Sequence, residues 1–368
     1  MLHKNINDRK KYGEAFQNLV GKRHVLWYIL FLTFLIPGCG FFPATGVAQK
    51  MTDAVAERML LYQRDNGGWP QPGGNAIDYE KELSSDQQKV LLRDKTKLDA
   101  TIDDQATTRE INYLVSAYQK TQNDGYRQAA ERGVRYLIKA QQTNGGWAQF
   151  YPDSSGYRKQ VTYNDNAMIN VLWVMQHTAQ GTHGFEKLDG VLAPLARQAV
   201  ERGIACIINT QYIQKGIRTA WCAQHDHISL LPTHARKFEL PSISGSESVG
   251  ILRFLMSLDN PSPEVIKTVK AAVTWLDSAR LTGIAVKKIV NQSGAKDVVV
   301  VADPTSTVWA RFYELDTNRP FFCGRDGVKK YNLAEIEQER RAGYAWYGTW
   351  PAKLLEKEYP AWAKKWEL

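Results

Sequence analysis

A repeated loop sequence constrains the fold of this chain more than any other feature. Asn-Gly-Gly-Trp closes an amphipathic stretch at residues 66–69 and again at residues 144–147, and a weaker copy passes through Gly216 to Trp221. Glycine after a helix supplies the left-handed backbone that ends it. The tryptophan that follows can fold back over a pair of helices. The loops therefore predict a chain built from repeated helical hairpins.

A second signature follows each loop, a polar cluster directly before a new stretch of helical periodicity. The clusters are Thr101-Ile102-Asp103-Asp104, Tyr163-Asn164-Asp165-Asn166 and Ser244-Gly245-Ser246-Glu247. The stretches after the first two carry apolar residues at positions i, i+3, i+4 and i+7, the pattern of a core-facing helix. We predict a fold dominated by α-helices, an incomplete α/α toroid or α/α barrel. The N-termini of the helices that follow the clusters should lie along the same rim of the toroid.

Other parts of the chain depart from the repeat. Residues 73–100 are polar and irregular and are predicted to form a long loop. Residues 284–290 and 298–302 are rich in β-branched side chains and predict a hairpin, with residues 309–313 as a candidate third strand. Two helices, at about 333–342 and 351–366, should close the chain. No Pro-, Gly- or Ser-rich linker follows residue 50, so residues 49–368 are expected to form one catalytic domain.

The first 48 residues read as an export signal. Residues 1–24 carry six basic and two acidic side chains, and the apolar run Val25–Ile36 that follows is too short to span a bilayer. Small residues end at Ala48, where we expect cleavage. A lipoprotein signal ending at Cys39, or an uncleaved anchor, is the alternative. The protein is predicted to be secreted or periplasmic, or a membrane-anchored lipoprotein.

Charge and cysteine usage limit the class of protein further. The net charge of +9 falls to +5 without the +4 of residues 1–24 (9 − 4), which still favours an acidic ligand. No nucleic-acid recognition motif is present. The three remaining cysteines, Cys206, Cys222 and Cys323, are too few and too far apart for a disulfide framework. No CxxC or HxxxH spacing predicts zinc.

The acidic clusters are the first candidates for chemistry. Asp103, Asp104 and Asp165 each precede a helix, where a single carboxylate often serves only as an N-cap. Doubled acidic and amide side chains exceed what a cap requires. Carboxylate and amide oxygens from two loops can hold Ca²⁺.

Two further groups of residues can be read chemically. Cys222 with His225 and Asp226 could form a thiol nucleophile and base, although this spacing is unspecific and buried cysteines are usually inert. A basic cluster late in the chain comprises Arg311, Arg319, Arg325, Lys329 and Lys330. Arginine binds carboxylates through a two-bond fork, so a carboxylated polysaccharide is a suitable ligand. Trp221 could stack on sugar rings, whereas Trp69 and Trp147 are better explained as core residues.

Several longer motifs resemble those of the family 10 pectate lyases. They are NGGWPQ (66–71), TIDDQAT (101–107), NGGWAQFYP (144–152), YNDNAM (163–168), WCAQHD (221–226), ARKFELPSISGSES (235–248) and NRPFFCGRDGVKKY (318–331). They occur in order over about residues 51–368. The resemblance implies an incomplete α/α toroid and Ca²⁺-dependent β-elimination of polygalacturonate.

The resemblance also implies roles for individual residues. Arg236 matches the catalytic base, Asp103 an aspartate needed for activity, Asp165 a calcium ligand and Arg325 an arginine that binds the substrate carboxylate. Asp104, followed by Gln105, stands where the family more often has Asn-Gly, and we assign it to the calcium site. Arg319 and Trp221 are assigned to substrate binding.

Two other functions compete with this interpretation. An α/α-barrel glycoside hydrolase could use a pair of carboxylates such as Asp103 and Asp165, and a non-catalytic protein could bind pectin. We expect a monomer whose partner is polygalacturonate. Membrane contact is expected only through a lipid anchor or an uncleaved signal, and nucleic acid is not expected to bind.

Overall fold

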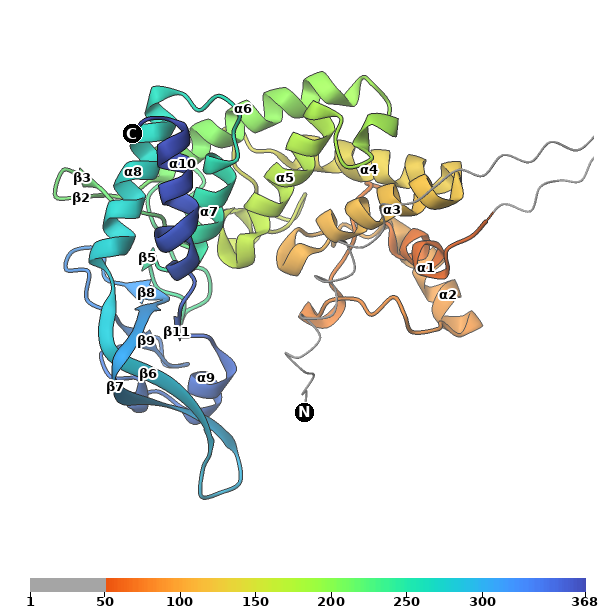
Figure 1. Ribbon diagram of the computed structural model, residues 1–368. Helices are drawn as coiled ribbons and strands as arrows, with labels where there is room; N and C mark the ends of the chain where they lie inside the picture. Colours follow the sequence, from red (N-terminus) through yellow and green to blue (C-terminus); the bar gives the residue numbers. More distant parts are fainter. Residues whose placement is uncertain (1–50) are drawn as a thin grey trace, which may run out of the picture. The chain divides into compact units, whose positions relative to one another are not determined.

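The computed structural model describes residues 51–368, and helical hairpins form the framework of this part of the chain (Figure 1). The predictions for residues 1–48 lie outside the described residues, and residues 49–368 form one compact unit. Within residues 51–368, none of the helices has the length and apolar character needed to cross a bilayer.

The helices form two layers. The main ones are α1 (Ala54–Tyr62), α3 (Thr108–Thr121), α4 (Asp124–Ala140), α5 (Ala167–Gln180), α6 (Leu192–Thr210), α7 (Glu247–Met256) and α8 (Pro263–Ser278). Helices α3 and α4, α5 and α6, and α7 and α8 pack as pairs. Helices α3, α5 and α7 contact one another in order, and α4, α6 and α8 do the same (Figure 1). The predicted succession of helical hairpins is confirmed.

Four tryptophans join the hairpins. The indole Nε1 of Trp69, Trp147, Trp221 and Trp309 donates to the carbonyl of Met59 (2.8 Å), Leu137 (2.8 Å), Ile207 (2.8 Å) and Leu276 (2.7 Å), respectively. The four acceptors lie in the last turns of α1, α4, α6 and α8, and all four rings are buried. The carbonyls of Leu137, Ile207 and Leu276 lie where the end of a helix leaves C=O groups without a backbone N–H partner, whereas the Met59 carbonyl also accepts the N–H of Gln63 (3.1 Å). The repeat therefore has a fourth copy, which the sequence hides because a long hairpin separates α8 from Trp309.

Three glutamines reinforce the same joints. The side-chain amide of each donates to a carbonyl of its own loop and to a carbonyl of the second helix of the following hairpin (α4, α6 or α8). Gln63 reaches Gly67 and Ala129, Gln141 reaches Gly145 and Ala199, and Gln211 reaches Thr219 and Thr268, at 2.8–2.9 Å. Each loop is thereby fastened to the following hairpin, which explains why the loops recur at similar intervals.

The hairpin inserted after α8 is longer than predicted. It consists of β6 (Leu281–Val290) and β7 (Lys296–Ala310), which pair antiparallel, and β11 (Tyr347–Gly348) pairs with β7 as the third strand. The prediction of a third strand at 309–313 is wrong, because Trp309 and Ala310 end β7. β8 (Phe312–Tyr313) pairs instead with β5 (Ile243–Ser244).

The remaining strands form two-residue pairs. They are β1 (Val161–Thr162) with β4 (Gln224–His225), β2 (Ile213–Gln214) with β3 (Ile217–Arg218), and β9 (Phe322–Cys323) with β10 (Lys329–Lys330). The pair β1–β4 links the loops that follow the second and third tryptophans. Segments far apart in the sequence therefore meet beside the helix N-termini.

The predicted loop at 73–100 is partly wrong, since it contains α2 (Ser85–Arg93). A reciprocal capping box between Ser84 and Gln87 starts this helix. None of its residues is buried, so it lacks the buried apolar stripe that marks the other helices. At the C-terminus the first predicted helix is shorter, α9 (Gln338–Gly343). The second is confirmed, because residues 352–365 are continuously helical and include a π-helical turn (Leu354–Glu358) that leads into α10 (Tyr359–Lys365).

Replacement of two separate glycines tests whether close packing of the tryptophan loops contributes to stability. Gly145 (φ +86°) and Gly216 (φ +82°) have the same left-handed backbone, but a Cβ at Gly145 would overlap the carbonyl oxygen of Arg202, whereas nothing lies within 4 Å at Gly216. Gly216→Ala should cost about 1 kcal/mol of unfolding free energy through backbone strain alone. Gly145→Ala should cost about 3 kcal/mol, because an overpacking penalty is added. Chemical denaturation measures both, and equal losses would contradict this account.

Candidate active site

The same tryptophans position the acidic turns that follow them. The backbone N–H of Thr101, Thr162 and Ser244 donates to the carbonyl of Trp69 (3.0 Å), Trp147 (3.1 Å) and Trp221 (2.7 Å), respectively. An acidic residue comes two or three positions later in each case, Asp103, Asp165 or Glu247. The turns at residues 103–105 and 164–166 contact each other, and the second contacts α7. The predicted gathering of these helix N-termini is confirmed.

Left-handed residues shape the first two turns. Asp104 (φ 42°) lies in the 3-10 turn Asp103–Gln105, and Asp165 (φ 51°) occupies the middle of the equivalent turn Asn164–Asn166. Burial and the neighbouring carboxylates of Asp165 and Asp104 raise the pKa of Asp103, although a hydrogen bond from Gln149 opposes the shift. The two turns therefore bring three negative side chains close together.

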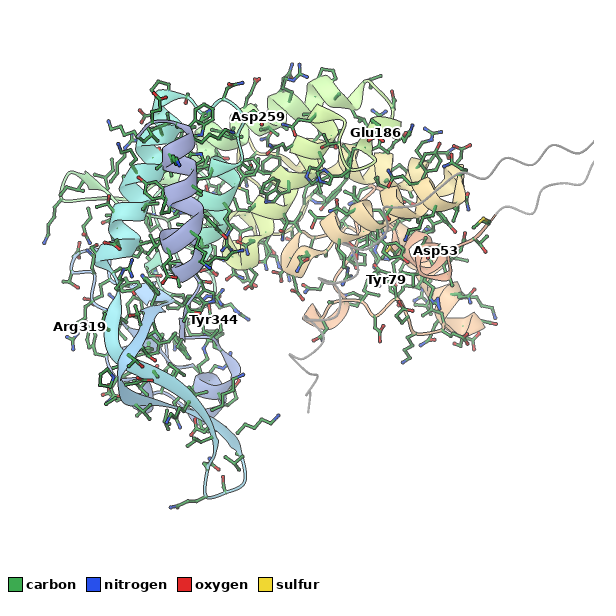
Figure 2. The ribbon with its side chains drawn as sticks, in the orientation of Figure 1. Asp53, Tyr79, Glu186, Asp259, Arg319 and Tyr344 are labelled. Carbon is green, nitrogen blue, oxygen red and sulfur yellow. The ribbon has the colours of Figure 1, made fainter. Side chains whose placement is uncertain are left out.

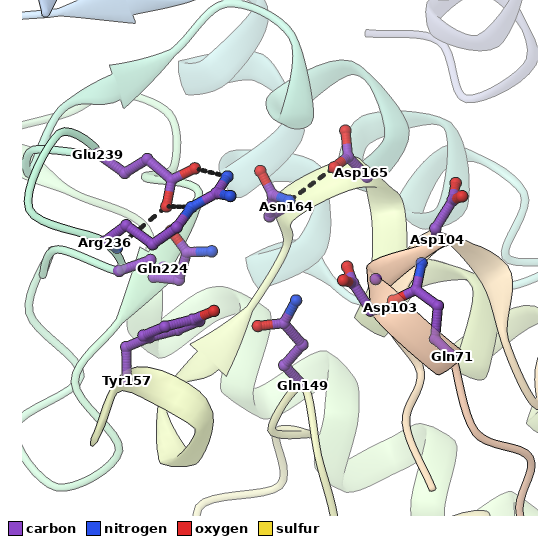
Figure 3. Close-up of a pocket in the computed structure, with 12 residues that line it drawn as sticks. Gln71, Asp103, Asp104, Gln149, Tyr157, Asn164, Asp165, Gln224, Arg236 and Glu239 are labelled. Carbon is purple, nitrogen blue, oxygen red and sulfur yellow. Dashed lines mark hydrogen bonds and ion pairs between the residues drawn. The ribbon is translucent and has the colours of Figure 1, made fainter. Parts of the chain in front are cut away.

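A cavity of about 270 Å³ opens between these turns and a loop from the third repeat. Figure 3 shows Asp103 and Asp104 on one side of it and Arg236 and Glu239 on the other. Its lining consists of Gln71, Gly74, Asp103, Asp104, Gln149, Tyr157, Asn164, Asp165, Gln224, Ala235, Arg236 and Glu239. A second cavity of about 550 Å³ shares Asp103, Gln149, Tyr157 and Arg236 with the first. The two form an extended polar surface suited to a chain-like, hydrophilic ligand.

Glu239 holds Arg236 in place. It accepts bonds from the backbone N–H of Arg236 (3.0 Å) and from its Nε (2.9 Å), and it also pairs with Nη2. The hydrogen bonding of the Arg236 guanidinium to the Glu239 carboxylate raises the pKa of Arg236. Burial favours the neutral form of Glu239, but the bonds from Arg236 prevail and lower its pKa. The pair is therefore a guanidinium bound to a carboxylate.

Phe238 gathers three arginines beside this pair. The guanidinium carbons of Arg236, Arg325 and Arg340 lie 5.1, 4.6 and 4.7 Å from the centre of its ring. Arg340 is only 6% exposed, and within residues 51–368 its Nε and Nη2 have no hydrogen-bond partner. Burial lowers the pKa of Arg340. Positive charge is thus concentrated on the side of the cavity away from Asp103 and Asp104.

Arg311 connects the second and third acidic turns. It pairs with Asp165 (3.1 Å) and with the buried Glu247. Burial opposes its charge, but Glu247 in particular outweighs this and raises the pKa of Arg311. Among the late basic residues, Arg311 is the one most directly tied to the acidic turns. Neither Glu247 nor Glu239 was among the predicted site residues, although the repeat places Glu247 where Asp103 and Asp165 occur.

The predicted site residues fall into two groups. Asp103, Asp104, Asp165 and Arg236 line one cavity. Arg325 lines neither cavity, but it shares the Phe238 ring with the cavity residue Arg236 and forms an ion pair with Glu339 at 2.7 Å.

Two of the predicted substrate contacts are not part of this site. Trp221 is fully buried, with its indole bound to Ile207, so the prediction that it stacks on sugars is wrong. Arg319 stacks on Tyr331 at 3.6 Å and lines neither cavity. In Figure 2 it lies at the outer edge of the C-terminal strands, away from Tyr344, which contacts Arg311.

The thiol hypothesis receives no support. Cys222 is buried, and burial raises the pKa of its thiol. The Nε2 atom of His225 accepts a hydrogen bond from the Cys222 backbone N–H (3.1 Å), and burial lowers the pKa of His225 to about 4. Cys206, Cys222 and Cys323 are all free and buried.

The acidic side of the cavity suits a hard cation chemically. Asp103, Asp104 and Asp165 offer carboxylates, and Gln149 and Asn164 add amide oxygens, all donors that Ca²⁺ accepts. Burial, with a smaller contribution from the carboxylates of Asp165 and Asp104, raises the pKa of Asp103, so a cation bound there would stabilise its ionised form. Within residues 51–368, no three acidic, His or Cys side chains already form a metal cluster. Amide oxygens and water would therefore have to complete the ligand set.

Comparisons with known proteins agree with this geometry. The sequence model of a family described as pectic acid lyase matches residues 63–355. Two solved structures, both of a family 10 polysaccharide lyase from Cellvibrio cellulosa, are similar. A mutant in complex with trigalacturonic acid is 34% identical, with a TM-score of 0.73 over 84% of this chain and 92% of its own. The second is 33% identical, with a TM-score of 0.72 over 84% and 91%. A search of curated proteins found no significant match.

The raised pKa of Asp103 predicts that the stability of the protein depends on pH. Because its folded-state pKa is raised, ionised Asp103 destabilises the fold, and this effect grows as pH rises from the unfolded-state pKa through the folded-state pKa. In metal-free buffer at neutral pH, Asp103→Asn should therefore raise Tm, and the gain should vanish in acid. Asp86→Asn, on the exposed helix α2, makes the same charge change and should give no gain. A lower Tm for Asp103→Asn at neutral pH would refute the expectation.

Proposed function

The chain belongs to the pectic acid lyase family, that of the family 10 polysaccharide lyases, and it is therefore a polysaccharide lyase; on this premise we propose that it cleaves α-1,4-linked polygalacturonate by β-elimination. The observation that carries the proposal is the cavity that holds Arg236 on one side and Asp103 and Asp104 on the other. A similar lyase is in complex with trigalacturonic acid. A polyuronate chain presents a carboxylate on every sugar, which suits the arginines around Phe238.

In this reaction the C5 proton leaves, the C4–O4 bond breaks, and a C4=C5 double bond forms. We assign Arg325 to the substrate carboxylate, because a guanidinium binds a carboxylate through two parallel bonds. Its present partner, Glu339, is exposed, so a substrate carboxylate can replace it at little cost. Positive charge held there stabilises the charge that develops next to C5 in the transition state.

Arg236 is the proposed base. A guanidinium has no acceptor atom while it is protonated, and Glu239 favours that form. Arg236 must therefore separate from Glu239 and lose a proton before it can accept one from C5. Arg325 and Arg340 share the Phe238 ring with it, and their charges oppose protonation of Arg236 once Glu239 has moved away.

Ca²⁺ is the proposed cofactor, held by Asp103, Asp104 and Asp165 with amide oxygens of Gln149 and Asn164. Bound there, it would supply a positive charge that acidifies the C5 proton through the adjacent carboxylate. Arg311 keeps Asp165 in position by pairing with it. Arg311 partly neutralises the carboxylate of Asp165, whereas Asp103 has no such ion pair among residues 51–368. Asp103 should therefore contribute more than Asp165 to cation affinity.

Two finer features complete the proposal. The two layers of helices support an incomplete α/α toroid of the kind that the sequence repeat predicts. The basic and apolar sequence of residues 1–36 supports export, either as a cleaved protein or as a lipoprotein anchored at Cys39. An exported monomer would meet polygalacturonate outside the cytoplasm.

Replacement of Arg236 tests the proposed base. With polygalacturonate and Ca²⁺, the protein should release products that absorb ultraviolet light through the new double bond. Arg236→Ala should lower kcat by about 10²–10⁴-fold, the usual effect of losing a general base. Lys237→Ala removes the neighbouring exposed charge and should retain most of the rate. Saturated reducing sugars without ultraviolet absorbance would instead indicate a hydrolase, and binding without any product would indicate a pectin-binding protein.

Chelation tests the proposed cofactor. EDTA should lower the rate by at least about 100-fold, equivalent to about 2.7 kcal/mol of lost transition-state stabilisation, and added Ca²⁺ should restore it. Asp165→Asn should raise the Ca²⁺ concentration needed for half-maximal rate, as measured by Ca²⁺ titration of the initial rate. Asp259→Asn, a remote acidic residue marked in Figure 2, should leave that concentration unchanged. A full rate in EDTA would contradict the calcium assignment.

A further inference from the structure

β-Elimination requires a proton for the departing O4 as well as a base for C5, and the arrangement described so far supplies no donor. Asp103, Asp104 and Asp165 are the proposed cation ligands. Glu239 is ionised because bonds from Arg236 lower its pKa. The amides of Gln71, Gln149, Asn164 and Gln224 do not release protons at useful rates. A leaving alkoxide would therefore have to depart unprotonated or take a proton from water.

Tyr157 carries the only hydroxyl among the residues that line either cavity. It belongs to the 3-10 helix Gly156–Lys159, which follows the second tryptophan loop. In Figure 3 its ring enters the cavity with the hydroxyl directed towards the space between Arg236 and Gln149. Within residues 51–368 this hydroxyl makes no hydrogen bond. It is therefore free to bind a ligand oxygen.

The backbone around Tyr157 is well fixed. Its carbonyl accepts from the N–H of Gln160 (3.1 Å), and the carbonyl of Lys159 accepts from the side chain of Gln142 in the second tryptophan loop (2.7 Å). The guanidinium of Arg158 stacks on Phe150 at 4.4 Å. A side chain held on both flanks can present its hydroxyl at a defined place, as proton transfer requires.

We infer that Tyr157 is the general acid that protonates the O4 leaving group, an inference that rests on the proposed elimination. As the base takes the C5 proton, the C5–H electrons form the C4=C5 bond and the C4–O4 electrons move to O4. The Tyr157 O–H bond then breaks and its proton passes to O4. The phenolate that remains interacts favourably with the nearby Arg236 and recovers a proton from water.

The stereochemistry of the sugar requires the base and the acid to be two different groups. In α-linked galacturonate the C5 hydrogen and O4 are both axial and lie on opposite faces of the ring. Arg236 comes from the loop after β4, whereas Tyr157 comes from the loop before β1, and both line the same two cavities. Two separate elements can thus address the two faces of one sugar.

The test compares wild-type protein with Tyr157→Phe and Tyr151→Phe. Tyr151 lies in the same loop but lines neither cavity, so its replacement is a matched loss of one hydroxyl. Initial rates are measured on polygalacturonate and on a short galacturonide with a dinitrophenyl ether at O4, whose phenolate leaves without protonation. Melting curves of all three proteins verify folding.

On polygalacturonate, Tyr157→Phe should lower kcat by about 10²–10⁴-fold and leave KM within about twofold, while Tyr151→Phe should behave as wild type. On the dinitrophenyl substrate, Tyr157→Phe should keep a rate within about threefold of wild type. Equal losses on both substrates, or a near wild-type kcat on polygalacturonate, would overturn the role of Tyr157. Failure of the wild-type protein to form any unsaturated product would instead overturn the proposed elimination itself.

Discussion

The hydrogen bond from a buried indole to the last turn of a helix is the interaction on which the rest of this structure depends. It recurs four times. In three of the four, the carbonyl of the same tryptophan also accepts the backbone N–H of a residue two or three positions before an acidic residue. One tryptophan therefore fixes both the end of a helical hairpin and the segment that leads into an acidic turn. Asp103 and Asp165 owe their proximity to core packing, not to local sequence.

The site is built from charges that the protein alone does not balance. Burial and the neighbouring carboxylates raise the pKa of Asp103, and burial lowers the pKa of Arg340, whose Nε and Nη2 have no hydrogen-bond partner among residues 51–368. Both arrangements cost stability, since a buried charge is favourable only when it is paired. A cation on one side and a polyanionic chain on the other would supply the missing partners. Such unbalanced charge is typical of sites organised for a ligand.

Part of the fold could be predicted because its signals are local. The tryptophan loops and the acidic clusters can be read directly from the sequence, and three of the four copies were found. The fourth copy was missed because β6 and β7 separate Trp309 from its helix. Helix α2 was missed because it buries no residue. Trp221 was assigned to sugar binding because composition cannot distinguish a core indole from an exposed one.

The sequence by itself determined the helical hairpins, the repeat and the choice of Asp103, Asp165 and Arg236 as candidate site residues, because each lies within a short continuous motif. Only the tertiary structure decided which distant side chains join them. Phe238 gathers Arg325 and Arg340, Glu239 restrains Arg236, and Arg319 is left outside. These contacts join loops that are more than eighty residues apart in the sequence, as between Phe238 and Arg325 or Arg340. No local pattern of residues encodes contacts over such a separation.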